Sequence, residues 1–187
     1  MRTGANGWVS GVRQVASPNC DKRPAGTVTE LLVIHNISLP PGEFGGDAIE
    51  RLFTNSLPVA AHPYYARLHG LKVSAHFLIR RDGEIVQFVS CNRRAWHAGA
   101  SSWQGKSRCN DYSIGVELEG SDEAPFEARQ YDSLSRLTRV LQRSYPLRGV
   151  AGHSDIAPER KTDPGPCFDW ARYLVTMRNP FPRFVAV

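Results

Sequence analysis

Two histidines and one aspartate in this chain have side chains that could hold a metal ion together. His35 lies in LLVIHNI (residues 31–37), just before a loop rich in proline and glycine. His153 ends GVAGH (residues 149–153), and Asp163 follows ten residues later in KTDPGP. Strand ends followed by loops are where α/β sheets form their sites. Two imidazoles and one carboxylate suit a catalytic zinc ion, which keeps one position for water.

Asp163 stands in a segment that proline and glycine make rigid. Pro164 favours an extended backbone at Asp163 and fixes its own φ, so a metal ligand held here loses little entropy on binding. Spacing alone leaves other ligands open, because Asp155 lies nearer to His153 and Cys167 is a softer ligand for zinc. We expect Asp155 to face solvent or to cap the turn at IAPER.

Four further histidines are alternatives to this pair: His62, His69, His76 and His97. His76 lies inside a predicted hairpin strand, which favours a packing role. His97 lies in a predicted long loop and could touch a substrate.

Lys161 lies two residues before Asp163. In an extended segment these two side chains point to the same side. An ammonium group beside a metal ion could stabilise an oxyanion that develops there. The alternative is a surface lysine paired with Glu159.

Two glutamates lie in the apolar segment SIGVELEG (residues 113–120). Strand alternation places Glu117 and Glu119 on one face and the large apolar side chains on the other. Such a carboxylate is either a solvent-facing strand residue or a general base. Periodicity does not choose between the two glutamates.

Apolar runs and turn signals predict the elements that position these side chains. Strands are expected over residues 31–37, 113–120 and 149–153, a hairpin over 73–89 with a two-residue Asp82-Gly83 turn, and helices over 48–55 (capped by Asp47), 125–145 and 168–177. Residues 55–70 are irregular or hold one short helix, and residues 92–111 form a long loop of the kind that usually serves function. Interleaved strands and helices predict an α/β fold, a central mixed sheet flanked by helices, with the zinc site in a groove at the strand ends.

The composition fits one globular domain, with 187 residues of which 41% are hydrophobic and 22% charged. A formal net charge of +5 favours an anionic partner. The arginines are scattered and no nucleic-acid signature is present, so nucleic acid is not the expected partner. No segment reaches the roughly 18 apolar residues of a membrane span, so no membrane association is expected.

Cysteine spacing and the first residues point to one compartment. The four cysteines lie far apart without a C-x-x-C pair, which indicates reduced thiols in a cytoplasmic protein. Pairing of Cys91 with Cys109 is the alternative. Residues 1–15 lack the apolar core of a secretory signal.

Five segments in this order carry a specific resemblance: VIHNISLPPGEFGG, SAHFLIRRDGEIVQFV, RAWHAG, CNDYSIGVELEG and GHSDIAPERKTDPGP. Together they resemble the AmpD-type cytoplasmic N-acetylmuramoyl-L-alanine amidases. These belong to a wider zinc amidase group that includes phage lysozyme-like amidases and peptidoglycan recognition proteins. The resemblance runs from about residue 7 to about residue 175. It implies one amidase domain, residues 1–187, with a mixed sheet, flanking helices and one zinc ion in a groove.

The resemblance also implies roles for single residues. The zinc ligands would be His35, His153 and Asp163, and the catalytic pair would be Glu117 and Lys161. Asp155 and Cys167 are then left with structural roles. The implied preference for Glu117 over Glu119 comes from the family and not from periodicity.

Four positions resemble family positions that contact substrate: Asn36, Trp96, Arg108 and Lys72. At position 72 close relatives are expected to have arginine. Lysine keeps the charge but lacks the planar fork of a guanidinium group, so its hold on a peptide carboxylate would be looser.

The implied substrate is a recycled cell-wall fragment, in which the lactyl group of 1,6-anhydro-N-acetylmuramic acid is amide-linked to L-alanine. Its peptide carries several carboxylates, which agrees with the basic charge of the chain. Zinc would activate water, Glu117 would take its proton, and Lys161 with zinc would hold the oxyanion. We expect a cytoplasmic monomer acting on this acidic muropeptide. The rival is a non-catalytic peptidoglycan-binding module on the same fold; such relatives have lost a zinc ligand, whereas all three positions are filled here.

Overall fold

A six-stranded mixed sheet forms the centre of the molecule. The computed structural model describes residues 1–176 of the chain. The strands follow the order β1 (Arg13–Gln14), β5 (Ile85–Gln87), β4 (Phe77–Ile79), β9 (Ser113–Glu119), β3 (Leu31–Ile37) and β10 (Gly149–Gly152). β4 and β5 are antiparallel, while β9, β3 and β10 run parallel to one another. The predicted mixed α/β sheet is confirmed.

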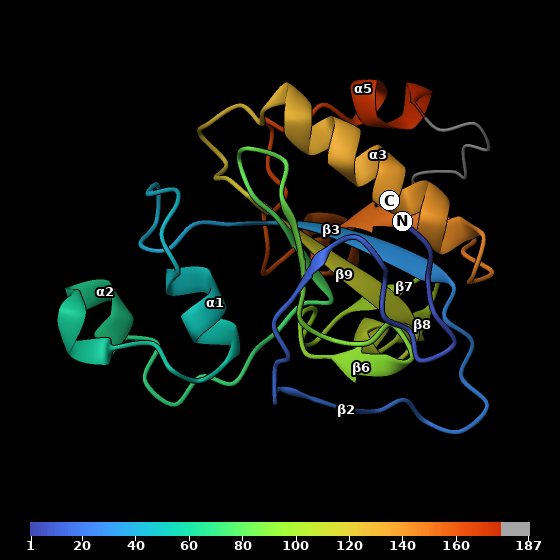
Figure 1. Cartoon of the computed structure of the whole chain (residues 1–187), viewed down its shortest axis with the longest axis horizontal. Helices are drawn as coiled ribbons and strands as arrows, with labels where there is room; N and C mark the ends of the chain where they lie inside the picture. The colour runs from blue at the N-terminus through green and yellow to red at the C-terminus, as the bar shows by residue number, and fades with distance from the viewer. Residues whose placement is uncertain (177–187) are drawn as a thin grey trace.

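Helices cover one face of this sheet. α3 (Ala128–Gln142) and α5 (Trp170–Val175) lie together along one side of the β3–β9 region (Figure 1). Their apolar residues pack with the side chains of β3, β4 and β9 that point to this side, such as Ile34, Phe77 and Val116. Alternation along each strand therefore sends the neighbouring side chains, including His35 and Glu117, to the opposite face.

The opposite face is covered by shorter pieces. α1 (Ala48–Phe53) packs on one part of it, and the remaining short elements are η1 (Val59–Ala61), α2 (Pro63–Ala66), β2 (Cys20–Lys22), β6 (Arg93–Ala95), β7 (Ser102–Trp103), β8 (Lys106–Ser107), η2 (Cys109–Asp111) and α4 (His153–Ile156). Because this face is also covered, every residue of β9 is buried. The expectation of a solvent-facing glutamate on this strand is therefore wrong.

Several predicted boundaries differ from the structure. The hairpin turn has three residues, 81–83, because Arg80 bonds both Gly83 and Glu84 through its backbone, and Gly83 takes the left-handed conformation (φ 86°) of a bulged turn. The side chain of Asp47 makes no helix cap and instead binds Arg51 at 2.7 Å. The helix predicted over 125–145 covers 128–142. The last helix begins at Trp170, and the end predicted at residue 177 lies outside the described residues.

The segment predicted as one long loop is folded into short strands. β6 pairs with β2, and β7 pairs with β8, so residues 92–111 form a compact layer on the sheet. α4 was not predicted; it begins at His153, where a strand end was expected.

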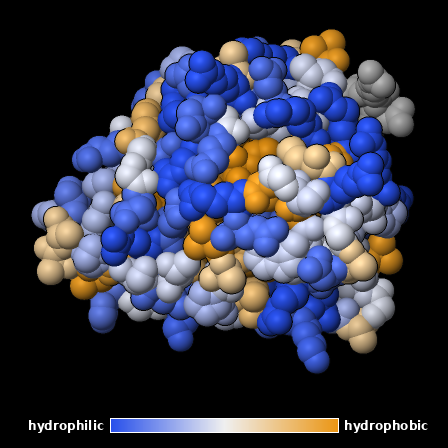
Figure 2. Space-filling view, in the orientation of Figure 1, coloured by the Kyte–Doolittle hydropathy of each residue, from blue (hydrophilic) through white to orange (hydrophobic). Residues whose placement is uncertain are grey.

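Hydrophilic residues cover most of the face shown in Figure 2. In the orientation of Figure 1, hydrophobic residues gather in a small central area surrounded by polar side chains (Figure 2). No helix within residues 1–176 combines the length and apolar character needed to cross a bilayer. All four cysteines are free thiols, so the alternative of a Cys91–Cys109 pair is wrong.

Candidate metal centre and active site

Strand register brings the predicted site residues together. His35 on β3 lies directly opposite Glu117 on β9, with both side chains on the face away from α3. β10 pairs with the other edge of β3, and the chain leaves it at Gly152 to place His153 at the start of α4. Asp163 sits in a turn that Gly165 closes by donating to the carbonyl of Thr162 at 3.0 Å.

Three ligand atoms converge at one point. Nδ1 of His35 lies 3.0 Å from Nδ1 of His153 and 2.9 Å from Oδ2 of Asp163. The third side, from His153 to Asp163, measures 3.1 Å. A tetrahedral zinc ion with bonds of about 2.0–2.1 Å holds its ligand atoms about 3.3–3.4 Å apart. The triangle is therefore close to the size that such an ion requires, and all three residues meet as one candidate metal group.

The protonation pattern of His153 also fits a cation at the centre. Its Nε2 lies 3.0 Å from the carbonyl oxygen of Ala98, to which it must donate. A neutral His153 then presents an unprotonated Nδ1 to the carboxylate of Asp163. Two lone pairs facing each other at this distance repel, whereas a metal ion between them binds both.

Burial sets the charges of this group. Burial, with the neighbouring His153, lowers the pKa of His35 to about 4. Burial alone would raise the pKa of Asp163, but the contacts of its carboxylate with His153 and His35 outweigh it and lower that pKa. At neutral pH His35 is uncharged and Asp163 is ionised, as metal ligands must be.

Glu117 is a buried carboxylate beside these ligands. It is 8% exposed, and its Oε2 has no hydrogen-bond partner among the described residues. Burial, reinforced by the charge of Asp163, raises its pKa well above the ordinary value, while Lys161 opposes this. A buried acceptor without a donor is costly, and a carboxyl with a raised pKa suits proton transfer near neutral pH.

Glu119 has different surroundings. Its carboxylate accepts from the backbone N–H groups of Gly45 (2.6 Å) and Arg81 (3.1 Å) and pairs with Arg80. Two of these contacts hold loops in place. The structure thus separates the two glutamates that strand periodicity could not separate.

Lys161 lies between two cavities next to Asp163. Among the described residues its ammonium group has no hydrogen-bond or ion-pair partner, so the alternative of a pair with Glu159 is wrong. Its charge acts on both His35 and Glu117. The ammonium group is therefore free to meet a ligand that enters the site.

A groove of about 420 Å³ opens over the three ligands. Glu117 and Lys161 line it together with the ligands, and an apolar part of its wall is formed by Leu52, Phe53, Tyr64, Leu68 and Leu71. These apolar wall residues were missed by the sequence analysis. The apolar spacing within residues 48–55 was the one available signal for part of this wall.

The four residues predicted to contact substrate do not all line the same cavity. Trp96 and Asn36 line the groove. Both amide hydrogens of Asn36 are directed to protein acceptors, Asp122 and the carbonyl of Pro164, which leaves its oxygen for a ligand. Lys72 lines a neighbouring apolar cavity of about 320 Å³.

Arg108 is the fourth of these positions. Its side chain is 69% exposed and is paired with Asp111 at 3.1 Å. It is not among the residues that line the groove.

The other candidate ligands have structural positions. Asp155 accepts from the backbone N–H of Gly152 at 2.7 Å and so caps the start of α4, not the turn at IAPER that was expected. Cys167 packs beside the main core. His76 is fully buried and bonded to the backbone of Gly115, in agreement with a packing role.

His97 is half-buried beside His35 and also lines the groove. Its Nδ1 lies 2.9 Å from Nε2 of His35, and its Nε2 lies 3.2 Å from Oγ of Ser113. Burial, with the nearby His35, lowers its pKa well below the ordinary value. The imidazole supports a predicted ligand from behind, a role that its place in a loop did not indicate.

Comparison with known proteins agrees with this site. The family model described as N-acetylmuramoyl-L-alanine amidase matches residues 25–166. The 1,6-anhydro-N-acetylmuramyl-L-alanine amidase AmpD of Escherichia coli (strain K12) is 57% identical over 171 residues, covering 90% of this chain and 93% of that protein.

Two solved structures extend the comparison. A crystal structure of a selenomethionine AmpD derivative superposes with a TM-score of 0.90 at 55% identity, covering 92% of this chain and 97% of that one. The Escherichia coli amidase AmiD, in complex with the substrate anhydro-N-acetylmuramic acid-L-Ala-D-gamma-Glu-L-Lys, matches with a TM-score of 0.59 at 29% identity, covering 83% of this chain and 60% of that one. Since the family model spans most of the chain and includes every residue of the convergent site, this protein belongs to the N-acetylmuramoyl-L-alanine amidase family.

Proposed function

We propose that this protein is a zinc-dependent hydrolase that cleaves the amide between the lactyl group of 1,6-anhydro-N-acetylmuramic acid and L-alanine. The observation that carries the proposal is the convergence of His35, His153 and Asp163 beside Glu117, whose Oε2 has no hydrogen-bond partner within residues 1–176. The activity is the one named for the 57% identical relative.

One zinc ion fits the donor set of this site. His35 and His153 would offer Nδ1, and Asp163 would offer Oδ2, from atoms that already lie 2.9–3.1 Å apart. When bound, zinc supplies a Lewis acid that activates water and polarises a carbonyl group.

Glu117 and Lys161 would carry the proton and the charge. The carboxylate of Glu117 would take a proton from the attacking water and later give it to the alanine amine, which leaves as the amide bond breaks. The ammonium of Lys161 would stabilise the negative charge that develops on the carbonyl oxygen. Glu117 suits this task because none of the described residues competes for its Oε2.

The groove suits an amphipathic muropeptide. Its polar lining residues include the reacting groups, and its apolar lining residues could pack against aliphatic parts of the substrate. A net charge of +5 favours the acidic peptide. Asn36 and Trp96 would contact substrate directly, and Lys72 would face a longer peptide at the adjoining cavity. Arg108 would reach a substrate only if its exposed side chain leaves Asp111.

We further propose that the enzyme works as a cytoplasmic monomer. The four free thiols fit a reducing compartment. A measurement of the molar mass in solution tests the monomer.

Two measurements test the activity. Mass spectrometry of an anhydromuropeptide should show release of the intact peptide after incubation with zinc-loaded protein, and native mass spectrometry should show one zinc ion per chain. Asp163→Ala should lose both. Tight binding of the fragment without cleavage by zinc-loaded wild type would favour a peptidoglycan-binding module instead.

A further inference from the structure

We propose that the dipeptide His97–Ala98 positions both histidine ligands of the metal centre, with His97 acting as a positioning residue for His35. This inference rests on the proposed zinc site. It concerns the two atoms that accept the Nε2 hydrogens of His35 and His153, on the side of each ring away from the metal.

The first link is between the two imidazoles. For His35 to bind a metal through Nδ1, its neutral ring must carry the hydrogen on Nε2. That nitrogen lies 2.9 Å from Nδ1 of His97, and the two ring planes are nearly perpendicular at 83°. His35 therefore donates, and Nδ1 of His97 accepts.

The second link fixes the hydrogen of His97. Because its Nδ1 accepts, a neutral His97 carries its hydrogen on Nε2, which lies 3.2 Å from Oγ of Ser113. The hydroxyl oxygen of this buried serine accepts it. The chain of hydrogen bonds thus runs in one direction, from the ligand His35 through His97 to β9.

The third link comes from the next residue. The carbonyl oxygen of Ala98 accepts from Nε2 of His153 at 3.0 Å. Two neighbouring residues thus receive the far N–H groups of both imidazole ligands. Acceptors of this kind fix the tautomer and the ring orientation of metal-binding histidines.

Two features hold the dipeptide in place. The side-chain oxygen of Asn110 accepts from the backbone N–H groups of both His97 (3.1 Å) and Ala98 (2.8 Å). Gly115 on β9 makes room for the His97 ring, because a Cβ there would lie 2.5 Å from Cγ of His97. A residue without a side chain is therefore needed at position 115 for this close approach of the ring to the strand.

The test is the zinc affinity of the full chain, measured by competition with a chromophoric chelator. His97→Leu should weaken zinc binding by about 10–100-fold. His97→Asn should recover most of this loss, because Oδ1 of asparagine can accept from His35 at the place of Nδ1. The control is His69→Leu, which removes an imidazole that lines the neighbouring cavity and bonds no ligand, and it should keep the affinity within about threefold of wild type.

A variant that leaves His35 unsupported without removing a polar group gives a second test. Gly115→Ala should push the His97 ring off the strand and weaken zinc binding in the same range as His97→Leu. Wild-type affinity in folded His97→Leu, or an asparagine variant no better than leucine, overturns the inference.

The wild-type protein itself gives a third test that needs no variant. In zinc-loaded protein with nitrogen-15 histidine, NMR should show Nε2 of His35 protonated and coupled through its hydrogen bond to Nδ1 of His97. An unprotonated Nε2 overturns the inference. A wild-type chain that binds no zinc refutes the proposed function itself, whereas zinc binding that is indifferent to His97 refutes only the positioning role.

Discussion

Glu117 and Glu119 lie on the same face of one strand, and both are buried, yet their surroundings are opposite. Glu119 has three donors for its carboxylate, from Gly45, Arg80 and Arg81. Glu117 has an oxygen that none of the described residues satisfies. The difference teaches that burial alone does not distinguish the two carboxylates, whereas the missing partner of Glu117 does and motivates its proposed catalytic role.

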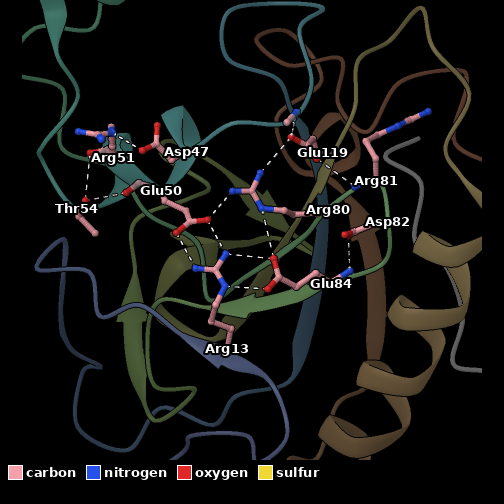
Figure 3. A network of polar contacts seen from close by, with 11 residues as sticks. Arg13, Asp47, Glu50, Arg51, Thr54, Arg80, Arg81, Asp82, Glu84 and Glu119 are labelled. Carbon is pink, nitrogen blue, oxygen red and sulfur yellow. Dashed lines mark hydrogen bonds and ion pairs between the residues drawn. The ribbon is translucent and has the colours of Figure 1, made fainter.

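The region around Glu119 is a network of ion pairs. Arg80 lies between Glu50, Glu84 and Glu119, while Arg13 reaches Glu50 and Glu84 from the N-terminal strand (Figure 3). This network ties β1, α1 and the β4–β5 hairpin to the end of β9. We infer that the carboxylate of Glu119 stabilises the fold, whereas the carboxylate of Glu117 is left free for chemistry.

Glu117→Gln is the variant with the largest expected effect on the proposed difference between Glu117 and Glu119. An amide cannot take a proton from water, so hydrolysis should fall on the order of a hundredfold or more, while zinc content stays at the wild-type level. Turnover and zinc content are measured on the same preparation. The matched control is Glu119→Gln, which should keep most of its activity; a dead Glu119→Gln with zinc intact would exchange the two assignments.

Lys161→Ala tests the charge that faces Glu117. The variant should keep zinc and bind product. Its kcat should fall by an amount that corresponds to roughly 3 kcal/mol of activation free energy, as for other single oxyanion donors. Lys161→Arg should recover part of this loss, since its wider planar head keeps the charge. A raised KM at unchanged kcat would instead make Lys161 a residue that binds the ground state.

Glu119→Ala tests the structural side. Removing the carboxylate leaves Gly45 and Arg81 without acceptors for their backbone N–H groups, so the free energy of unfolding should fall by about 2 kcal/mol. Urea denaturation measures this. Glu117→Ala removes an unsatisfied group, so it should lower the free energy of unfolding of the metal-free protein by less. An equal loss in the two variants would contradict the proposed difference between the two glutamates.

The smallest expected effect is the pH dependence of the network. Hydrogen bonds from Arg13, and next those from Arg80, lower the pKa of Glu50 to about 2 against the opposing effect of burial. A lowered folded-state pKa adds stability that is complete above the unfolded value, near 4.5, and is lost as the pH falls toward about 2. Urea midpoints at pH 6, 4 and 3 should therefore converge for wild type and Glu50→Gln; a constant gap at all three would contradict this.

Much of the central sheet could be predicted from the sequence. The apolar branched run at residues 31–37 coincides with β3, and SIGVELEG ends one residue beyond β9. Such strands are strongly marked because they are buried on both faces. The convergence of His35, His153 and Asp163 could be proposed because each follows or ends a predicted strand or rigid segment.

The supporting layer could not be predicted in the same way. Strands of two or three residues, such as β6, β7 and β8, are too short to show a period. Whether a loop histidine meets substrate or a ligand depends on which strand it packs against, and for His97 that depends on the glycine at 115. Alternation placed Glu117 and Glu119 on one face, but which donors reach each of them is decided by the loops that cover that face.

The order of strands in the sheet has a consequence for protein synthesis. β3 is made early, but its two neighbours, β9 and β10, come later in the chain. A nascent polypeptide that has left the ribosome up to residue 148 would therefore carry one of the most apolar strands with an open edge, the arrangement most prone to pair with a foreign chain. His153 and Asp163 follow β10 in the chain, so the proposed metal site can be complete only once the strand that closes this edge has been made.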